Sequence, residues 1–139
     1  MRELSSLLLG VIIVGFVCNN YIKNMNLTDV VSTIDNRSYR VRKLPDKLDA
    51  ANKLAEISES LTELVDHVYL TDKDKEGVIQ LKNNFNSRNI IENAPGGQYT
   101  AYSVNKGEQL ALCLRDAESG SFIELNLILF VSIHELAHV

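Results

Sequence analysis

The sequence predicts an α+β fold: an N-terminal membrane helix, a long amphipathic helix, an antiparallel β-hairpin or sheet, and a buried helix at the end. Three observations support this fold class. Residues 4–18 are apolar apart from two serines, residues 46–69 repeat apolar side chains at three- and four-residue steps, and residues 127–139 are apolar in nearly every direction around a helix. At 139 residues, the chain is long enough for one domain of ordinary size.

Residues 1–22 are predicted to be a membrane anchor or a signal segment. The strictly apolar core from Leu7 to Cys18 would span only about 18 Å as a helix, whereas Leu4 to Ile22 would span about 28 Å of a hydrocarbon layer about 30 Å thick. We favour an uncleaved, single-pass anchor that tethers the chain to a membrane. The alternative is a secreted protein whose signal segment has been removed.

The balance of charge changes near Pro45. Residues 1–44 carry six basic and three acidic side chains, whereas residues 45–139 carry eight basic and fifteen acidic ones, which gives a net charge of −4. We interpret residues 23–44 as a basic juxtamembrane linker, with a short strand at Ser38–Val41, and residues 45–139 as the folded domain. An acidic domain gives no clear indication of nucleic-acid binding.

Two helices are expected at the start of this domain. The first runs from about Asp46 to Tyr69, and Pro45 suits its first turn. The second is shorter and runs from Asp72 to about Asn83, where Thr71 and Asp74 resemble a capping box. A segment rich in loop-forming residues and the breaker at residues 94–97 then separate these helices from the strands.

A β-hairpin follows the helices. Gln98–Val104 is predicted to be a strand, Asn105–Glu108 a turn with glycine where a positive φ is needed, and Gln109–Leu114 the returning strand. Because both faces of the returning strand are apolar, we expect it to be a central strand.

The last predicted element is a buried helix that begins at Asn126 as its N-cap. Two histidines and a glutamate in a buried helix would be costly without compensation, and a bound metal compensates them. His134 and His138 are one helical turn apart, so both imidazoles can reach one zinc ion at about 2.0–2.1 Å. Glu135 lies about 100° further round the helix, within reach of a water on the metal. This is the H-E-x-x-H motif, two zinc ligands and a general base.

The sequence resembles a family of metallopeptidases. The resemblance rests on the segments His134–His138 on its apolar helix, Tyr102–Glu108, Leu112–Arg115 and Tyr39–Lys47, together with the apolar N-terminal segment. They are similar to the zincin metallopeptidases of large nucleocytoplasmic DNA viruses, which are themselves similar to the WLM group. The resemblance implies a zincin-like fold with a buried active-site helix, and a viral or host membrane as the site of the anchor.

The resemblance also implies the roles of individual residues. His134 and His138 would be zinc ligands, Glu135 the general base, and an edge strand would align a peptide or protein substrate; the candidate residues on that strand are Tyr99, Ala101 and Ser103. Zinc would lower the pKa of its bound water to about 7, and Glu135 would accept the proton and pass it to the leaving amine.

The family pattern has a third ligand in a downstream Gly-His segment, and nothing follows Val139 here. We therefore expect a fold that is incomplete at its C-terminus and a chain that is inactive as it stands. Two alternatives remain open. One is a non-catalytic, membrane-tethered interaction or structural protein on a degenerate zincin scaffold. The other is a two-histidine site completed by a second chain. The substrate, the orientation in the membrane and the oligomeric state are not indicated.

Overall fold

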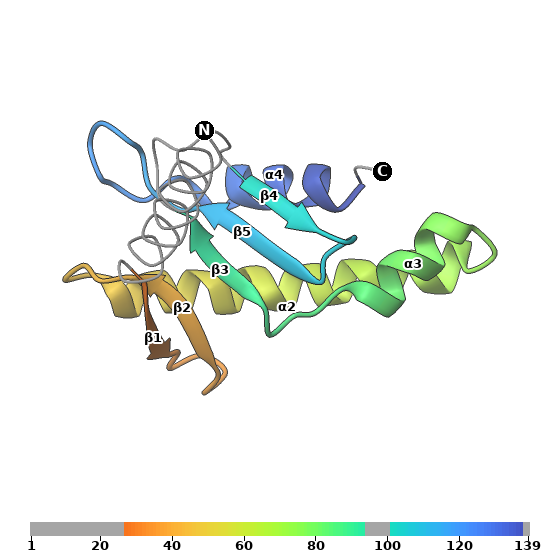
Figure 1. Ribbon diagram of the computed structural model, residues 1–139, viewed down its shortest axis with the longest axis horizontal. Helices are drawn as coiled ribbons and strands as arrows, with labels where there is room; N and C mark the ends of the chain where they lie inside the picture. The colour runs from red at the N-terminus through yellow and green to blue at the C-terminus, as the bar shows by residue number, and fades with distance from the viewer. Residues whose placement is uncertain (1–26, 94–100, 138–139) are drawn as a thin grey trace, which may run out of the picture.

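The computed structural model describes residues 27–93 and 101–137, which form an α+β arrangement of two small sheets and three helices (Figure 1). A hairpin of two strands lies at one end of the long helix α2, and a three-stranded sheet lies between α2 and the last helix, α4 (Figure 1). The hydrophobic core is formed by side chains of α2, β2, β3, β5 and α4.

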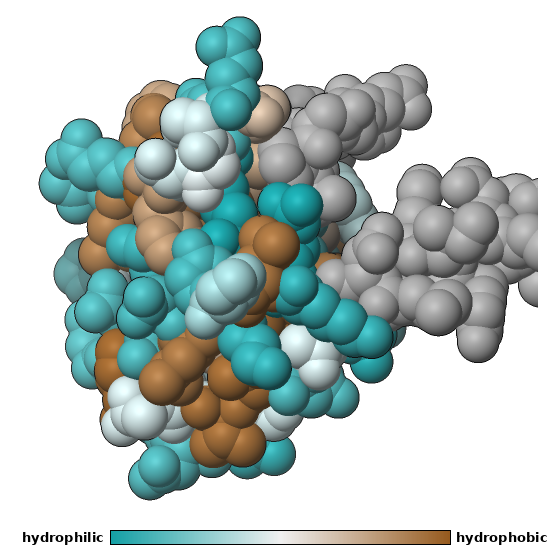
Figure 2. All heavy atoms as spheres, turned by 90° about the vertical axis from the view of Figure 1, so that its left-hand side faces the viewer, coloured by the Kyte–Doolittle hydropathy of each residue, from teal (hydrophilic) through white to brown (hydrophobic). Residues whose placement is uncertain are grey.

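The segment expected to be a linker folds as an antiparallel hairpin. β1 (Leu27–Val31) pairs with β2 (Ser38–Arg42), and the inward side chains of β2, Tyr39 and Val41, are fully buried. The short strand predicted at Ser38–Val41 is therefore confirmed, but its partner β1 was not predicted. Val31 and Ile34 are exposed, and Figure 2 shows hydrophobic side chains grouped on the lower part of the face at this end of the molecule.

The buried phenol of Tyr39 is held by a carboxylate of the hairpin turn. Its hydroxyl donates to Oδ2 of Asp35 over 2.5 Å. Burial, together with this hydrogen bond, raises the pKa of Tyr39 from 10.0 to about 12. In the unfolded chain the phenol would ionise above pH 10, while the folded protein keeps it neutral. The stabilisation is therefore complete below pH 10 and is lost as the pH rises toward 12.

We expect Tyr39→Phe to remove this alkaline loss of stability. Between pH 9 and pH 12, the free energy of unfolding should fall further for the wild type than for the variant. The difference should be at most about 2–3 kcal/mol, since each pKa unit corresponds to about 1.4 kcal/mol. Urea midpoints measured across this range would show the difference. Tyr102→Phe, at a half-buried tyrosine of β4, is the control and should keep the wild-type slope. Parallel slopes for wild type and Tyr39→Phe would contradict the interpretation.

Helix α2 (Lys47–Asp72) buries one stripe of small and aliphatic side chains, as the three- and four-residue spacing predicts. Its predicted span of residues 46–69 is close to the observed one. The predicted capping box is wrong, because the Thr71 hydroxyl lies within the last turn of α2 and donates to the carbonyls of His67 and Val68. The second helix, α3 (Glu76–Asn84), begins later than expected and buries no side chain.

The second sheet is mixed. β3 (Ile90–Asn93) pairs in parallel with β5 (Gln109–Cys113), which pairs antiparallel with β4 (Ala101–Val104), so the strand order is β3-β5-β4. The prediction that the returning strand is central is confirmed by β5. The predicted turn is also present, with Gly107 at a φ of +95°. The breaker at residues 94–97 lies outside the described part of the chain.

The predicted fold class requires three corrections. The sheet is mixed rather than antiparallel, because β3 joins β5 in parallel. The last helix is covered on one face only, as described below. No helix within residues 27–93 and 101–137 is long and apolar enough to cross a membrane, so the predicted membrane helix has no support here. The segment on which that prediction rests, residues 1–22, lies outside the described residues.

Candidate metal and peptide site

Helix α4 (Leu125–Ala137) lies along β4 and β5 and buries one face against them (Figure 1). The buried positions, Ile128, Ser132 and Leu136, recur every four residues and therefore form a single stripe. Apolar side chains outside this stripe are exposed; Phe130 is 69% exposed, and Leu127, at the flank of the stripe, is 54% exposed. The helix was expected to be buried because its sequence is apolar all round, but only one layer of structure covers it among the described residues.

The start of α4 also differs from the prediction. The first backbone hydrogen bonds of the helix run from Leu127 and Ile128 to the carbonyl of Glu124, so Glu124 precedes the first turn. Asn126 is already inside the helix and does not cap it. Within the helix, the Ser132 hydroxyl donates to the Ile128 carbonyl over 2.7 Å, which satisfies a polar group in the buried stripe.

The predicted metal site lies in the last turns of α4. His134 has an exposed side chain and Glu135 a half-buried one, and both are in regular helix. His138 lies outside the described residues, so the pair of histidines is only half described. No group of three potential ligands among His, Cys, Asp and Glu occurs within residues 27–93 and 101–137.

The candidate peptide-binding strand is placed next to this turn of α4. Among the described strands, β4 is an edge strand, and its antiparallel partner β5 occupies one of its two sides. The Ser103 hydroxyl donates to the backbone carbonyl of Glu135 over 3.3 Å. Ala101 is two residues earlier and is buried beneath α4. Of the three strand residues predicted to meet a substrate, Tyr99 lies outside the described residues.

The turn after β4 fits closely against the end of α4. Gly107 has a positive φ, and a Cβ atom added there would lie 2.9 Å from Cδ2 of Leu136. The same atom would also lie 3.1 Å from the Phe85 ring, in the loop after α3. The absence of a side chain at Gly107 therefore lets the turn, the loop after α3 and the end of α4 meet.

A buried ionic cluster, which the sequence did not reveal, joins the strands that carry α4 to the rest of the fold. Arg115 donates from Nε to Glu92 over 2.9 Å and from Nη1 to Asp46 over 2.5 Å. The other oxygen of Glu92 accepts from the backbone N–H of Arg42 over 2.8 Å. We call Asp46, Glu92 and Arg115 the ionic cluster. It connects the N-terminus of α2, strand β3 and the end of β5.

The electrostatics of this cluster favour the charged arginine. Burial alone would lower the pKa of Arg115, but hydrogen bonds to Asp46 and Glu92 outweigh that effect and raise it. The Arg115 guanidinium also stacks over the Phe122 ring, with 4.6 Å between Cζ and the ring centroid. Phe122 and Arg115 also form an isolated antiparallel β-bridge, shortly before α4 begins. The cluster thus lies at the base of the segment that leads into the candidate site.

Comparisons with known proteins give viral relatives and one structural neighbour. The chain is 39% identical over 114 residues to the uncharacterized protein R325 of Acanthamoeba polyphaga mimivirus, covering 79% of this chain and 58% of that protein. It is 30% identical over 88 residues to the uncharacterized protein 136R of Invertebrate iridescent virus 6, covering 62% and 48%. The chain therefore spans about half the length of the curated relatives it matches. No protein-family model matches the chain.

A solved structure with a similar fold is that of Wss1 from Saccharomyces cerevisiae. The match has a TM-score of 0.52 at 25% sequence identity and covers 69% of this chain and 66% of that one. The fold is thus similar to that of a WLM-type metallopeptidase. This agrees with the family that the sequence resembles, at the level of the fold.

Proposed function

We propose that this chain carries part of the active site of a zinc-dependent peptidase, in which His134 and His138 hold the metal and Glu135 is the general base. The observation that carries the proposal is the placement of His134 and Glu135, the described part of the H-E-x-x-H motif, in a helix beside strand β4. The similarity of the fold to Wss1 supports the same conclusion.

The described residues fit a zinc site as far as they extend. α4 is regular helix from Leu125 to Ala137, and the side chain of His134 is exposed rather than enclosed in the core. Imidazole nitrogens are common zinc ligands, and a position four residues further along the same helix faces the same direction. If the helix continues through His138, the two histidines would supply two zinc ligands, and the described residues offer no group of three potential ligands.

The chemistry of the site would depend on the bound metal and on the carboxylate of Glu135. When bound, zinc supplies a Lewis acid that acidifies a water and polarises a carbonyl. The carboxylate of Glu135 would act as the general base, accepting a proton from water and delivering it to the leaving amine. Its helix is held beside β4 by the hydrogen bond from Ser103 to the Glu135 carbonyl, which fixes the position of the base relative to the strand.

The edge strand offers a way to hold a substrate. An extended peptide can add to the side of β4 that β5 does not occupy, and backbone hydrogen bonds would then align it independently of its sequence. Because Ser103 contacts Glu135, a peptide on this strand would pass close to the proposed base.

Zinc binding tests the proposal. His134→Ala should weaken zinc binding by more than about 100-fold, because loss of an outer-shell partner alone costs roughly 10–100-fold in metal affinity. Equilibrium dialysis with metal analysis measures the affinity. Glu135→Gln should retain the metal, since Glu135 is not a ligand. His67→Ala is the matched control, because His67 is an exposed histidine on α2, and it should bind zinc as the wild type does.

Equal zinc binding by the wild type, His134→Ala and His67→Ala would contradict the proposed site. Absence of bound zinc in every variant would instead favour a non-catalytic interaction protein. The exposed apolar side chains of α4, Leu127, Phe130 and Ile133, are the observation that would support this second function.

A further inference from the structure

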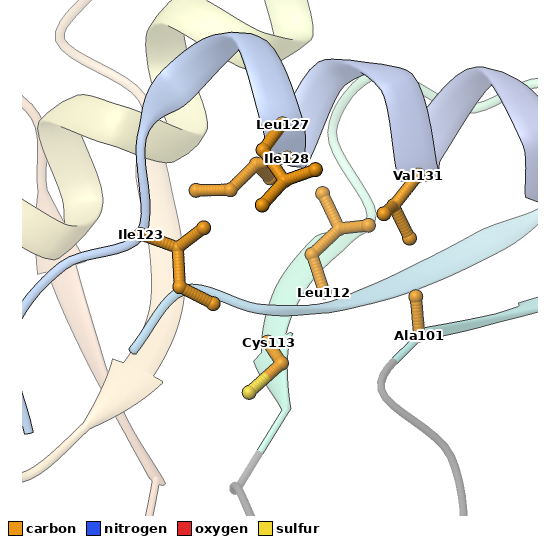
Figure 3. A pocket seen from close by; sticks show the side chains of 7 residues that line it. All are labelled: Ala101, Leu112, Cys113, Ile123, Leu127, Ile128 and Val131. Carbon is orange, nitrogen blue, oxygen red and sulfur yellow. The ribbon is translucent and has the colours of Figure 1, made fainter. Parts of the chain in front are cut away.

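An apolar cavity lies between α4 and the sheet, one helical turn before the proposed base. It has a volume of about 110 Å³ and is partly open. Figure 3 shows side chains of α4 directed toward the sheet, and Ala101 and Leu112 directed up toward the helix. The described residues that line it are Ala101, Leu112, Cys113, Ile123, Leu127, Ile128 and Val131.

The chemistry of the wall selects an apolar occupant. None of the seven lining side chains carries a charge, and the one polar atom among them, Sγ of Cys113, already contacts the carbonyl of Arg115 at 3.3 Å. A buried water needs two to four polar partners, which this wall does not offer. The cavity is also smaller than the roughly 150 Å³ site that takes benzene in an engineered protein, so it suits a branched aliphatic side chain.

The depth and the mouth of the cavity are formed by different residues. Ala101, Leu112 and Ile128 are buried and form the floor, whereas Leu127 is more than half exposed and lies at the mouth. We therefore place the opening of the cavity beside Leu127. This arrangement resembles a binding pocket more than a packing defect, because a packing defect would be closed on every side.

The position of the cavity relates it to the peptide strand. Ala101 of β4 lines it, and Ser103, two residues further along the strand, contacts Glu135. Two strand residues span about 7 Å, and the four residues from Val131 to Glu135 on α4 span about 6 Å. We propose that this cavity is a specificity pocket that accepts a leucine-like side chain of a peptide lying on β4, within about two residues of the bond next to Glu135. The assignment of the peptide as substrate rests on the proposed function.

The test measures binding without metal or cleavage. N-acetyl-leucine methylamide is titrated into the isotope-labelled chain, and methyl resonances of Ile123, Ile128 and Val131 are followed by NMR. We expect saturable shifts with a Kd on the order of 1–10 mM, which is the affinity that so small a ligand can reach. N-acetyl-aspartate methylamide should not shift these resonances, because a carboxylate cannot be solvated in the cavity.

Two variants at exposed positions of α4 distinguish binding in the cavity from nonspecific hydrophobic binding to the helix surface. Leu127→Lys places an ammonium group at the mouth and should weaken binding at least about fivefold. Phe130→Lys makes the same change at a more exposed position that does not line the cavity, and it should leave the Kd within about twofold. Both positions are exposed, so neither change should prevent folding.

Three results would overturn the pocket. They are no saturable shift with the leucine probe, equal binding of the aspartate probe, or equal weakening by the two lysine variants. Nuclear Overhauser contacts from the cavity methyls to residues 1–26 in the free chain would also contradict it, since the chain would then fill its own cavity. Because no zinc is present, binding of the leucine probe together with failure of the zinc experiment would separate the pocket from the proposed catalysis.

Discussion

Arg115→Met is expected to lower the free energy of unfolding by about 3–5 kcal/mol, because it leaves the carboxylate of Glu92 buried without its charged partner. The side chains of Arg115 and Glu92 are 2% and 1% exposed, so water cannot replace the missing guanidinium. The backbone N–H of Arg42 would still donate to Glu92, but one hydrogen bond does not compensate a buried charge. Methionine keeps most of the volume of the arginine stem, so the effect isolates the charge.

Urea denaturation followed by circular dichroism measures this loss, with two further variants as controls. The double variant Arg115→Met, Glu92→Met removes both charges and should recover most of the stability, as replacement of a buried pair by apolar residues often does. Asp46→Asn should cost about 1 kcal/mol or less, because the side chain of Asp46 is 38% exposed and solvent screens it. If Arg115→Met were within 1 kcal/mol of wild type, or if the double variant were as unstable as the single one, this account would be wrong.

Gly107→Ala is expected to destabilise the fold by about 2–4 kcal/mol. A residue other than glycine at a φ of +95° is strained by about 1–3 kcal/mol, and the added methyl group must also displace Leu136 and Phe85. The contact to Phe85 includes its Cα atom at 3.3 Å, which belongs to the backbone and cannot rotate away. The turn would therefore move away from the end of α4.

Gly120→Ala is the matched control for the backbone term. Gly120 also has a positive φ, +72°, but no atom lies within 4 Å of a Cβ added there, so we expect a loss of only about 1 kcal/mol. Thermal or urea unfolding of both variants gives the difference between them, which reports the packing against Leu136 and Phe85. Equal losses would show that the close approach at Gly107 has no energetic consequence.

The elements with clear local patterns were predictable from the sequence. The apolar spacing of residues 47–72 is sufficient to identify α2, and the glycine in a polar turn is sufficient to identify the β4–β5 connection. Both faces of β5 are apolar, and it is indeed the central strand. These features depend on neighbours in the sequence, so pattern and structure agree.

The elements that depend on distant partners were not predictable. β3 is a four-residue strand, Ile90–Asn93, and its pairing with β5 could not be recognised from so short a run. Its buried Glu92 is paired with Arg115, which lies two residues after the neighbouring strand β5. The burial of α4 was overestimated for a related reason, since an apolar sequence shows what a helix can bury and not how many layers cover it.

For the candidate site, the sequence was informative about chemistry and less so about surroundings. The motif at His134 and Glu135 lies on a helix, as its spacing required, and Ser103 of the predicted substrate strand contacts that helix. The cavity beneath Leu127 and the ionic cluster had no local signal, because each is formed by residues from three or more separate segments.

The ionic cluster also has a consequence for the order in which the chain folds. Asp46 and Arg115 are 69 positions apart, so their contact closes a long loop and carries a large entropic cost until other contacts have formed. The β1–β2 hairpin and the α2–α3 pair need only short loops and can form early. Arg115 can reach both carboxylates only after β5 has joined β3. We therefore expect the ionic cluster to form late in folding, when it joins the N-terminal half of the domain to the half that bears α4.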